Sequence, residues 1–272
     1  MTMAEDRIAA LPAAGFTREL FRLDGKVALI MGGRGALAQA MAATLADLGC
    51  SVALASRHES DCVQIATGIA ARYGQRALGL RCDIAREEEI EQALTQVTAQ
   101  LGDIGILINN AGASWWGLPQ DIPLAGWRKV VDVNLTGTFL ACRHVARRMI
   151  VSGGGAIVNI ASVGAFLSYV PEAGQVVPYT TTKAAIVHLT QDLAAQWAGH
   201  GIRVNAIAPG SVESGMTDTL NEDVRQRLLS RILLRRFGRP LEVAGAVALL
   251  ASAAGSFITG ETLLVDGGQA IG

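Results

Sequence analysis

Short, continuously apolar runs alternate along the chain with segments whose apolar residues recur every three to four positions. Such runs, bounded by Gly, Asn or Asp, are typical of strands that a parallel sheet buries on both faces. They predict strands at Lys26–Met31, Ser51–Ala55, Ala77–Cys82, Ile104–Ile108, Ala156–Ala161, Ile202–Ile207 and Thr262–Val265. Helices are predicted between them at Ala36–Leu48, Ser60–Arg72, Arg86–Gln100, Leu124–Val151, Tyr179–Ala198 and Pro240–Ser252.

The repeated order of strand, helix and strand predicts βαβ units with right-handed crossovers. We therefore expect an α/β fold, a doubly wound Rossmann-type sheet of about seven parallel strands with helices on both faces. No linker or internal repeat divides the chain, so residues 23–272 are expected to form one domain after an N-terminal extension, residues 1–22. Ligands of such sheets bind at the carboxyl ends of the strands.

The composition sets further limits on the function. Hydrophobic residues make up 50% of the 272 residues and charged residues 17%, which favours a large aliphatic core over disorder. The formal net charge of -1 argues against a nucleic-acid binder. The N-terminus is unlike a secretory signal, and residues 243–260 are too weakly apolar for a membrane span. We expect a cytoplasmic protein without a membrane or nucleic-acid partner.

Cysteine and histidine spacing indicates neither disulfides nor a metal site. The cysteines form no CxxC pair, and no histidine stands beside them at ligand spacing, so buried free thiols are expected. These residues are Cys50, Cys62, Cys82, Cys142, His58, His144, His188 and His200.

A glycine-rich turn follows the first predicted strand. Its spacing Gly33-x-Gly35-x-x-Ala38 fits a loose dinucleotide-binding pattern that opens a helix. Backbone N–H groups and the helix dipole at such a turn favour a pyrophosphate. A tight turn without a ligand would use the same residues. The position at the start of a βαβ series favours the nucleotide.

The second strand ends without the acidic residue that would bind the ribose hydroxyls of NAD. Ser56 and Arg57 instead offer a hydroxyl and a cation to a 2′-phosphate, and Arg34 offers a second cation. This predicts NADP(H), with NAD(H) possible; the alternative is that Arg57 is only a solvated residue. After the third strand, Asp83 can accept from an adenine amino group or cap the next helix.

Two further motifs identify a family resemblance. Asn109-Asn110-Ala111-Gly112 follows the fourth strand, and Tyr179-Thr180-Thr181-Thr182-Lys183 opens a helix. The chain resembles the short-chain dehydrogenase/reductase family, in its YxxxK branch, over about residues 23–270. Other matching segments are Asp132-Val133-Asn134, Ile160-Ala161-Ser162, Asn205–Gly210 and Val265–Gly268. Within the family the pattern is most similar to sugar and polyol oxidoreductases such as gluconate 5-dehydrogenase.

The resemblance implies hydride transfer between NADP(H) and a carbonyl or secondary alcohol, by a ketoreductase or a sugar or polyol dehydrogenase. It makes Tyr179 the general acid/base, with Lys183 lowering its pKa and binding the nicotinamide ribose. Ser162 would hydrogen-bond the substrate oxygen, and Asn134 would hold a water that connects Lys183 to solvent. From the residues alone, a Tyr and a Lys four apart share a helix face, and an ammonium lowers a phenol's pKa. An ordinary surface pair has the same spacing.

The cofactor contacts implied by the resemblance lie at the strand ends and on the catalytic helix. They are Gly32, Gly33, Arg34, Ala36, Leu37, Ser56, Arg57, Asp83, Ile84, Asn110, Ala111, Gly112, Tyr179, Lys183, Pro209, Gly210, Val212 and Ser214.

The chain departs from the family pattern at several positions. Ala36 and Ala38 stand where the family has Gly, and each adds a methyl where the backbone approaches the pyrophosphate. Met31 replaces a Thr, and Ser214 replaces a Thr but keeps its hydroxyl. Residues 169–174 lengthen the loop before Tyr179.

The substrate region is expected around two segments. Ser114, Trp115 and Trp116 line the pocket mouth, or else pack in an interface or under a loop. Residues 211–234 resemble the family's substrate lid, and their charges recur as on a solvated helix face. The resemblance also implies a homotetramer or a dimer.

Two other functions compete with an oxidoreductase. A non-catalytic nucleotide-binding or scaffold protein would explain Ala36 and Ala38, but not the retained Ser162, Tyr179 and Lys183. A halohydrin-dehalogenase-like lyase on the same fold would have Arg in place of Lys183.

Overall fold

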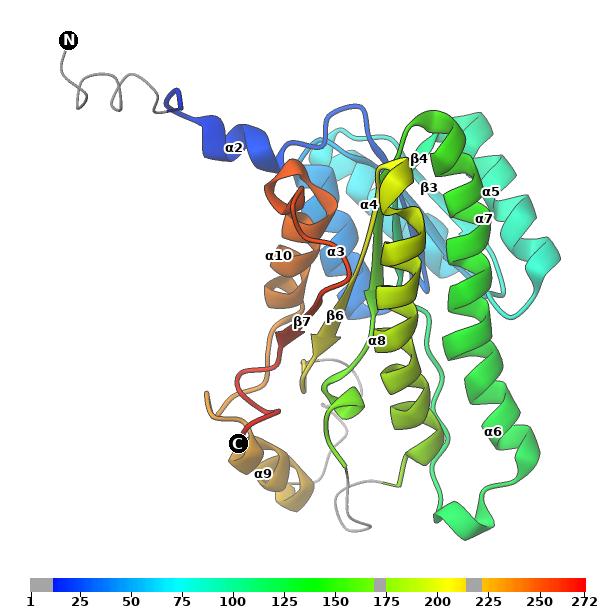
Figure 1. The fold of residues 1–272 in the computed structure, drawn as a ribbon, viewed down its shortest axis with the longest axis vertical. Coiled ribbons are helices and arrows are strands. Elements are labelled where there is room, and N and C mark those ends of the chain that lie inside the picture. Colours follow the sequence, from blue (N-terminus) through cyan, green and yellow to red (C-terminus); the bar gives the residue numbers. More distant parts are fainter. Residues whose placement is uncertain (1–11, 169–174, 214–221) are drawn as a thin grey trace.

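The computed structural model describes residues 12–168, 175–213 and 222–272. Its strands form one parallel sheet in the order β3-β2-β1-β4-β5-β6-β7, which confirms the expected doubly wound α/β fold (Figure 1). The strands are β1 (Val27–Met31), β2 (Ser51–Ser56), β3 (Ala77–Arg81), β4 (Ile104–Asn109), β5 (Gly155–Ile160), β6 (Ile202–Pro209) and β7 (Thr262–Val265). Each begins within one residue of its predicted start.

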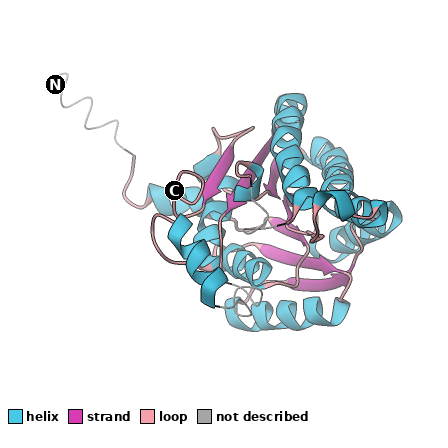
Figure 2. Ribbon diagram, turned by 90° about the horizontal axis from the view of Figure 1, so that it is seen from below, coloured by secondary structure: helices cyan, strands magenta, loops and turns pink. Residues whose placement is uncertain are grey.

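Helices cover both faces of the sheet, as Figures 1 and 2 show. One face packs against α3 (Ala36–Asp47), α4 (Glu59–Tyr73) and α10 (Pro240–Ala251). The other face packs against α5 (Glu87–Leu101), α7 (Gly137–Ser152) and α8 (Val177–Trp197). Because helices cover both faces, all five residues of β1 are buried. Continuous apolar runs are therefore what this sheet requires.

The long helix predicted at residues 124–151 is interrupted. It consists of α6 (Leu124–Val131), a π-helical turn at Asp132–Thr136, and α7. Gly137 follows the wide turn, and a Cβ there would lie 2.7 Å from the carbonyl oxygen of Ile84. The helix thus passes very close to the loop after β3, and a π turn of this kind often marks a functional site.

Two short helices lie at the periphery. Neither α2 (Phe16–Phe21) nor α9 (Glu222–Arg231) has a buried residue, and α9 falls in the segment expected to be a lid. Residues 169–174, expected to lengthen the loop before Tyr179, and Ser214 lie outside the described residues.

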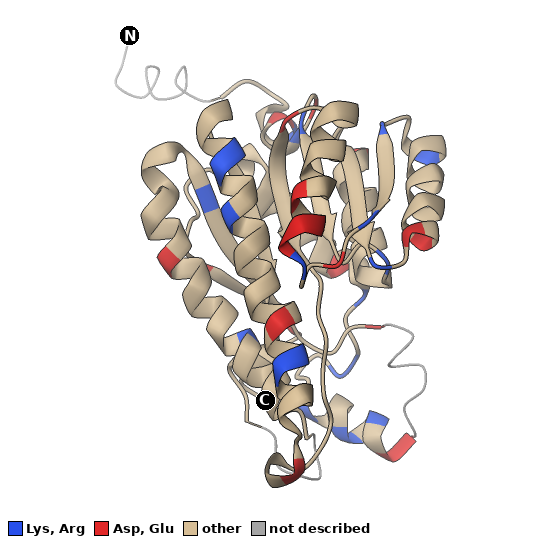
Figure 3. Ribbon diagram, turned by 90° about the vertical axis from the view of Figure 1, so that its right-hand side faces the viewer, with Lys and Arg blue, Asp and Glu red and all other residues tan. Residues whose placement is uncertain are grey.

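Basic and acidic residues are interspersed on the helices, and neither sign covers the whole face seen in Figure 3. Among the described residues, no helix combines the length and apolar character needed to cross a bilayer.

Candidate active site

The glycine turn after β1 is tied to both neighbouring strands. The N–H of Gly32 donates to the carbonyl of Ala55 over 2.8 Å, and the side-chain amide of Asn110 donates to the carbonyl of Gly32 over 2.9 Å. Gly32 has φ +81°, and a Cβ there would lie 2.5 Å from the backbone of Ala111. Only glycine fits this approach of β1 to β4, where the strand order reverses.

The start of α3 is open to an anion. Gly35 is the N-cap, and no side chain caps the helix. The Ala38 methyl that was expected to crowd the turn is fully buried in the core, whereas Ala36 is exposed. The first-turn N–H groups therefore lack side-chain partners, as an anion site at a helix N-terminus requires.

A cavity of about 310 Å³ lies beside this turn. Nine of the residues assigned to the cofactor line it, from the ends of the four strands β1 to β4: Gly32, Arg34, Ser56, Arg57, Asp83, Ile84, Asn110, Ala111 and Gly112. The cavity is also lined by residues that no sequence motif marks: His58, Cys82, Lys129 and Val133. No local pattern predicts Lys129 at the cavity, because the position of its helix α6 depends on how the chain between β4 and β5 packs on the sheet.

The groups expected to bind a 2′-phosphate differ in their surroundings. Arg34 forms an ion pair with Asp61 at 2.9 Å. The Ser56 hydroxyl accepts from the His58 N–H and donates to the His58 carbonyl, so it organises its own turn. Arg57 lines the cavity and forms no ion pair with any residue that the structure describes.

Asp83 does not cap a helix, so that alternative is wrong. The N-cap of α5 is Arg86. One carboxylate oxygen of Asp83 accepts from the Ala85 N–H at 3.1 Å, and the Asp83 N–H donates to Glu89 at 2.8 Å. The chain turns once more before α5 begins, which keeps Asp83 at the cavity wall.

Tyr179, Lys183 and Ser162 come together at the carboxyl end of β5. The Ser162 side chain is hydrogen-bonded to Tyr179 and accepts from the Gly164 N–H. Lys183 is 4% exposed, and its Nζ donates to the carbonyl of Ile160 over 2.6 Å. Tyr179 and Lys183, one helical turn apart on α8, thus both contact the carboxyl end of β5.

The expected lowering of the Tyr179 pKa by Lys183 is not found. Burial raises the Tyr179 pKa, opposed by the hydrogen bond with Ser162. Burial also lowers the Lys183 pKa to about 8. The Lys183 Nζ lies 5.6 Å from the centre of the Tyr179 ring and is directed to a carbonyl. Desolvation is therefore the largest influence on the pKa of both side chains.

Asn134 lies fully buried in the π-helical turn. Its side chain accepts from the Ala113 N–H at 2.7 Å and donates to the Ala113 carbonyl at 2.9 Å. It also donates to the Thr182 hydroxyl at 3.0 Å, and Thr182 in turn donates to the Tyr179 carbonyl. The oxygen and the nitrogen of the side-chain amide thus both have partners within the protein. The role of Thr182 was not predicted.

The sheet edge beyond β5 carries the remaining assigned residues. The Gly210 N–H donates to the carbonyl of Val265 over 3.0 Å, and a Cβ on Gly210 would lie 2.7 Å from Asp266. Pro209 ends β6, and Val212 forms a bridge to Gly238. The chain after β6 is therefore held against the end of β7.

The two tryptophans near the site differ. The ring of Trp115 lies 2.5 Å from where a Cβ on Gly126 would be, so it packs closely on α6. Trp116 is 64% exposed. Trp115 thus packs against a helix, and not under a loop as one of the expected alternatives had it.

A polar network lies beneath the site between β4, β5, α7 and α8. Asn109 donates to Asn159 over 2.9 Å, and Asn159 donates to Thr190 over 3.0 Å. Cys142 contacts Asn109 at 3.1 Å. All four cysteines are buried and unpaired, as expected.

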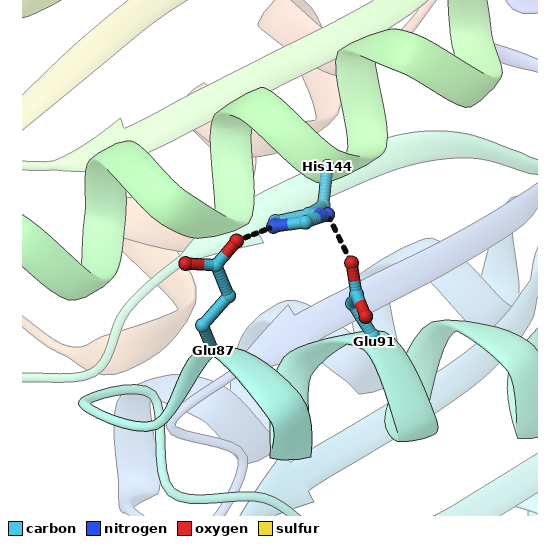
Figure 4. Close-up of side chains that lie close together, drawn as sticks. All are labelled: Glu87, Glu91 and His144. Atoms are coloured by element: carbon cyan, nitrogen blue, oxygen red, sulfur yellow. Dashed lines mark hydrogen bonds and ion pairs between the residues drawn. The ribbon is translucent and has the colours of Figure 1, made fainter.

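One histidine lies near two carboxylates, a cluster that the spacing of residues along the chain does not indicate. His144 on α7 lies between Glu87 and Glu91 of α5, at 2.7 and 3.3 Å (Figure 4). Each ring nitrogen faces a different carboxylate, and Arg143 also pairs with Glu87. One imidazole cannot offer both nitrogens to one ion. The arrangement suits a histidine that joins the two helices better than a metal ligand.

The site combines what binding of a dinucleotide requires with groups for proton transfer. At one end lie a helix N-terminus without a side-chain cap and a turn that only glycine fits. The cavity beside them is lined by Arg57, which has no ion pair among the described residues. The Ser162–Tyr179 pair and the buried Lys183 lie at the neighbouring strand end.

Comparisons with known proteins agree with this arrangement. A family model described as enoyl-(acyl carrier protein) reductase matches residues 33–270. A 3-oxoacyl-(acyl-carrier-protein) reductase of Aquifex aeolicus is 40% identical over 248 residues, covering 91% of this chain and 98% of that protein. A short-chain type dehydrogenase/reductase of Mycobacterium marinum has a TM-score of 0.88 at 38% identity, with 93% and 99% of the two chains covered. A gluconate 5-dehydrogenase of Burkholderia cenocepacia, in complex with NADP and tartrate, has a TM-score of 0.88 at 34% identity, with 94% and 99% covered.

Proposed function

The chain belongs to the short-chain dehydrogenase/reductase family of oxidoreductases, and on that premise we propose that it transfers a hydride between NADP(H) and a carbonyl or secondary-alcohol substrate. The observation that carries the proposal is the hydrogen-bonded Ser162–Tyr179 pair beside the buried Lys183. A scaffold protein would have no use for a buried lysine of this kind, whose desolvation is costly.

The roles of the side chains follow from their positions. Ser162 and Tyr179 are adjacent donors, so both hydroxyls can hydrogen-bond one substrate oxygen and stabilise the charge that develops on it. In the reducing direction Tyr179 gives its proton to that oxygen, and in the oxidising direction it takes the proton back. The nicotinamide, when bound, supplies or accepts the hydride.

Lys183 has two tasks in this proposal. Its ammonium would hydrogen-bond the ribose next to the nicotinamide, and it would hold positive charge near the Tyr179 oxygen. That charge would favour the phenolate and oppose the effect of burial on the Tyr179 pKa. Protons would reach Lys183 through a water held at Asn134, which is fully buried in the π-helical turn.

The cavity beside the glycine turn would hold the adenosine half of the cofactor and is called the adenosine cavity below. The residues around it support NADP(H) over NAD(H). Arg57 and Arg34 line the cavity, and no acidic residue ends β2. The uncapped first turn of α3 would bind the pyrophosphate, as Ala38 does not obstruct it. The substrate class is a ketone or a sugar or polyol alcohol, the two classes named among the similar proteins.

The test is a nucleotide titration followed by a substrate screen. NADPH and NADH are titrated separately by fluorescence energy transfer from tryptophan, and calorimetry checks any negative result. We expect tighter binding of NADPH, and then NADPH oxidation with a panel of β-keto esters and keto sugars. Tighter binding of NADH would reverse the cofactor assignment, and failure of both nucleotides would favour the non-catalytic alternative.

We also propose that the protein assembles as a homotetramer or a dimer. Within the described part of the chain, the edge strand β7 pairs only with β6, and apolar side chains around it are exposed: Leu241, Phe257 and Leu264. An unpaired apolar sheet edge is a liability for a monomer, and a second copy related by two-fold symmetry would cover it.

A further inference from the structure

Arg34, one of the two cations assigned to the cofactor phosphate, is already paired with a carboxylate of the protein. Its Nε lies 2.9 Å from Oδ2 of Asp61. Arg34 belongs to the glycine turn after β1, and Asp61 belongs to the first turn of α4. An internal anion therefore holds a guanidinium that lines the adenosine cavity.

The neighbouring polar groups decide how much this pairing affects binding of a phosphate. The Ser56 hydroxyl is used within its own turn, by the N–H and carbonyl of His58 at 3.1 and 3.2 Å. Arg57 has no ion pair or side-chain hydrogen bond to residues 12–168, 175–213 or 222–272. A phosphate that binds here can pair with Arg57 directly, but it has to displace Asp61 before it can pair with Arg34.

We propose that Asp61 is a specificity-determining residue that competes with the 2′-phosphate of NADP(H) for Arg34 and so reduces the preference for NADP(H) over NAD(H). The inference rests on the proposed function, because it concerns the cofactor of the same site. NAD(H) has hydroxyls at this position and leaves the Arg34–Asp61 pair intact. Only the phosphorylated cofactor would require the exchange.

The size of the effect follows from the exposure of the pair. The side chains are 56% and 44% exposed, so water and salt weaken their attraction. A pair of this kind changes an equilibrium by a few-fold, not by orders of magnitude. The Asp61 charge also repels the phosphate directly, and both effects act in the same direction.

The experiment compares Asp61→Asn with Glu59→Gln by measuring the Kd of NADPH and of NADH. Glu59 stands in the same helical turn, and its side chain forms no ion pair within the described chain. Glu59→Gln therefore removes one negative charge from this turn without breaking the Arg34–Asp61 pair. We expect Asp61→Asn to lower the Kd of NADPH about 3- to 10-fold, and Glu59→Gln to change it less than about 2-fold. The Kd of NADH should stay within about 2-fold in both variants.

A double variant separates pairing from general charge. In an Arg34→Gln background, Asp61→Asn should lose most of its effect on NADPH, because the cation for which the two anions compete is gone. An Asp61→Asn effect no larger than that of Glu59→Gln would overturn the inference and leave the proposed function intact. If neither NADPH nor NADH binds the wild-type chain or the Asp61→Asn variant, the proposed function is wrong and the inference falls with it.

Discussion

At the residue scale, Lys183 is the side chain of the site whose charge is strongly destabilised by desolvation. It is almost fully buried, with one hydrogen bond to the carbonyl of Ile160, and burial lowers its pKa to about 8. Its proton is therefore held much less firmly than in solution. Such a group is expected at a site that exchanges protons near neutral pH.

Lys183 makes stability depend on pH in a direction that can be worked out. The pKa is about 8 when folded and 10.5 as the ordinary value, so the unfolded chain binds more protons between these pH values. Stability then rises with pH across this window. From pH 7 to pH 10, the free energy of unfolding of wild type should rise by about 2–3 kcal/mol relative to Lys183→Met.

The measurement for Lys183 is urea unfolding of both proteins at several pH values. The difference between the two curves isolates this one group, because all other titrating residues are shared. Parallel curves over the whole pH range would contradict the lowered pKa.

Tyr179 is tested by removing only its hydroxyl. Tyr179→Phe should reduce kcat about 10²- to 10⁴-fold, the usual contribution of general acid–base catalysis, while the Kd of NADPH changes little. Tyr73→Phe, at the end of α4, serves as the control and should keep its activity. A kcat of Tyr179→Phe within a few-fold of wild type would refute the assignment.

At the element scale, the ends of the strands are shaped by close backbone contacts. The turn after β1 meets β4 at Gly32, and α7 meets the loop after β3 at Gly137. These contacts bring the carboxyl ends of the strands together into one site. The sequence marks the glycines, but it does not say which backbone each one approaches.

Two glycines of one turn should respond differently to alanine. Gly32→Ala puts a methyl 2.5 Å from Ala111 at φ +81°, and should destabilise the fold by about 2–4 kcal/mol and weaken nucleotide binding. Gly35 has φ -77° and no atom within 4 Å of a Cβ, so Gly35→Ala should fold normally. Thermal unfolding compares them, and equal stability of the two variants would contradict this geometry.

The polar network beneath the site joins α8 to the sheet. Thr190→Val leaves the Asn159 amide without its partner, which should cost about 1–3 kcal/mol. Thr67→Val is the matched control, because both hydroxyls donate to the carbonyl four residues earlier but Thr67 is exposed. Chemical denaturation measures both, and a loss as large in Thr67→Val would show that the network adds nothing.

At the scale of the whole molecule, the sheet ends at β7 in an edge that none of the described elements covers. β7 carries Leu264 on this edge, and fully exposed Phe257 lies shortly before it. The opposite side of the sheet ends in β3, which α4 covers closely enough that Gly79 meets the backbone of Val63. The two ends of the molecule thus differ, and assembly is expected at β7.

Leu264→Lys should shift the protein to smaller species, because a charge on the edge would be buried in the assembly. Val63→Lys on α4, at the far end of the sheet, should leave the assembly unchanged. Sedimentation velocity at several concentrations measures both. A wild-type protein that is monomeric at all concentrations would rule out the assembly itself.

The sequence by itself determined the strands and most of the helices, and it predicts the reacting groups. Burial between two helical layers demands apolar runs, and these can be read locally from the order of residues. The Tyr179–Lys183 spacing and the glycine turn are equally local. The π-helical turn could not be read from the local sequence, because it arises where the helix passes the loop after β3.

Only the tertiary structure decided how groups from separate elements meet. It paired Arg34 with Asp61, brought Lys129 to the adenosine cavity and used the Asn134 side chain on Ala113. It also set the direction of the Tyr179 pKa, since burial depends on everything packed around the ring. Distances between side chains on different elements follow from how crossovers pack on the sheet, and no local pattern of residues encodes them.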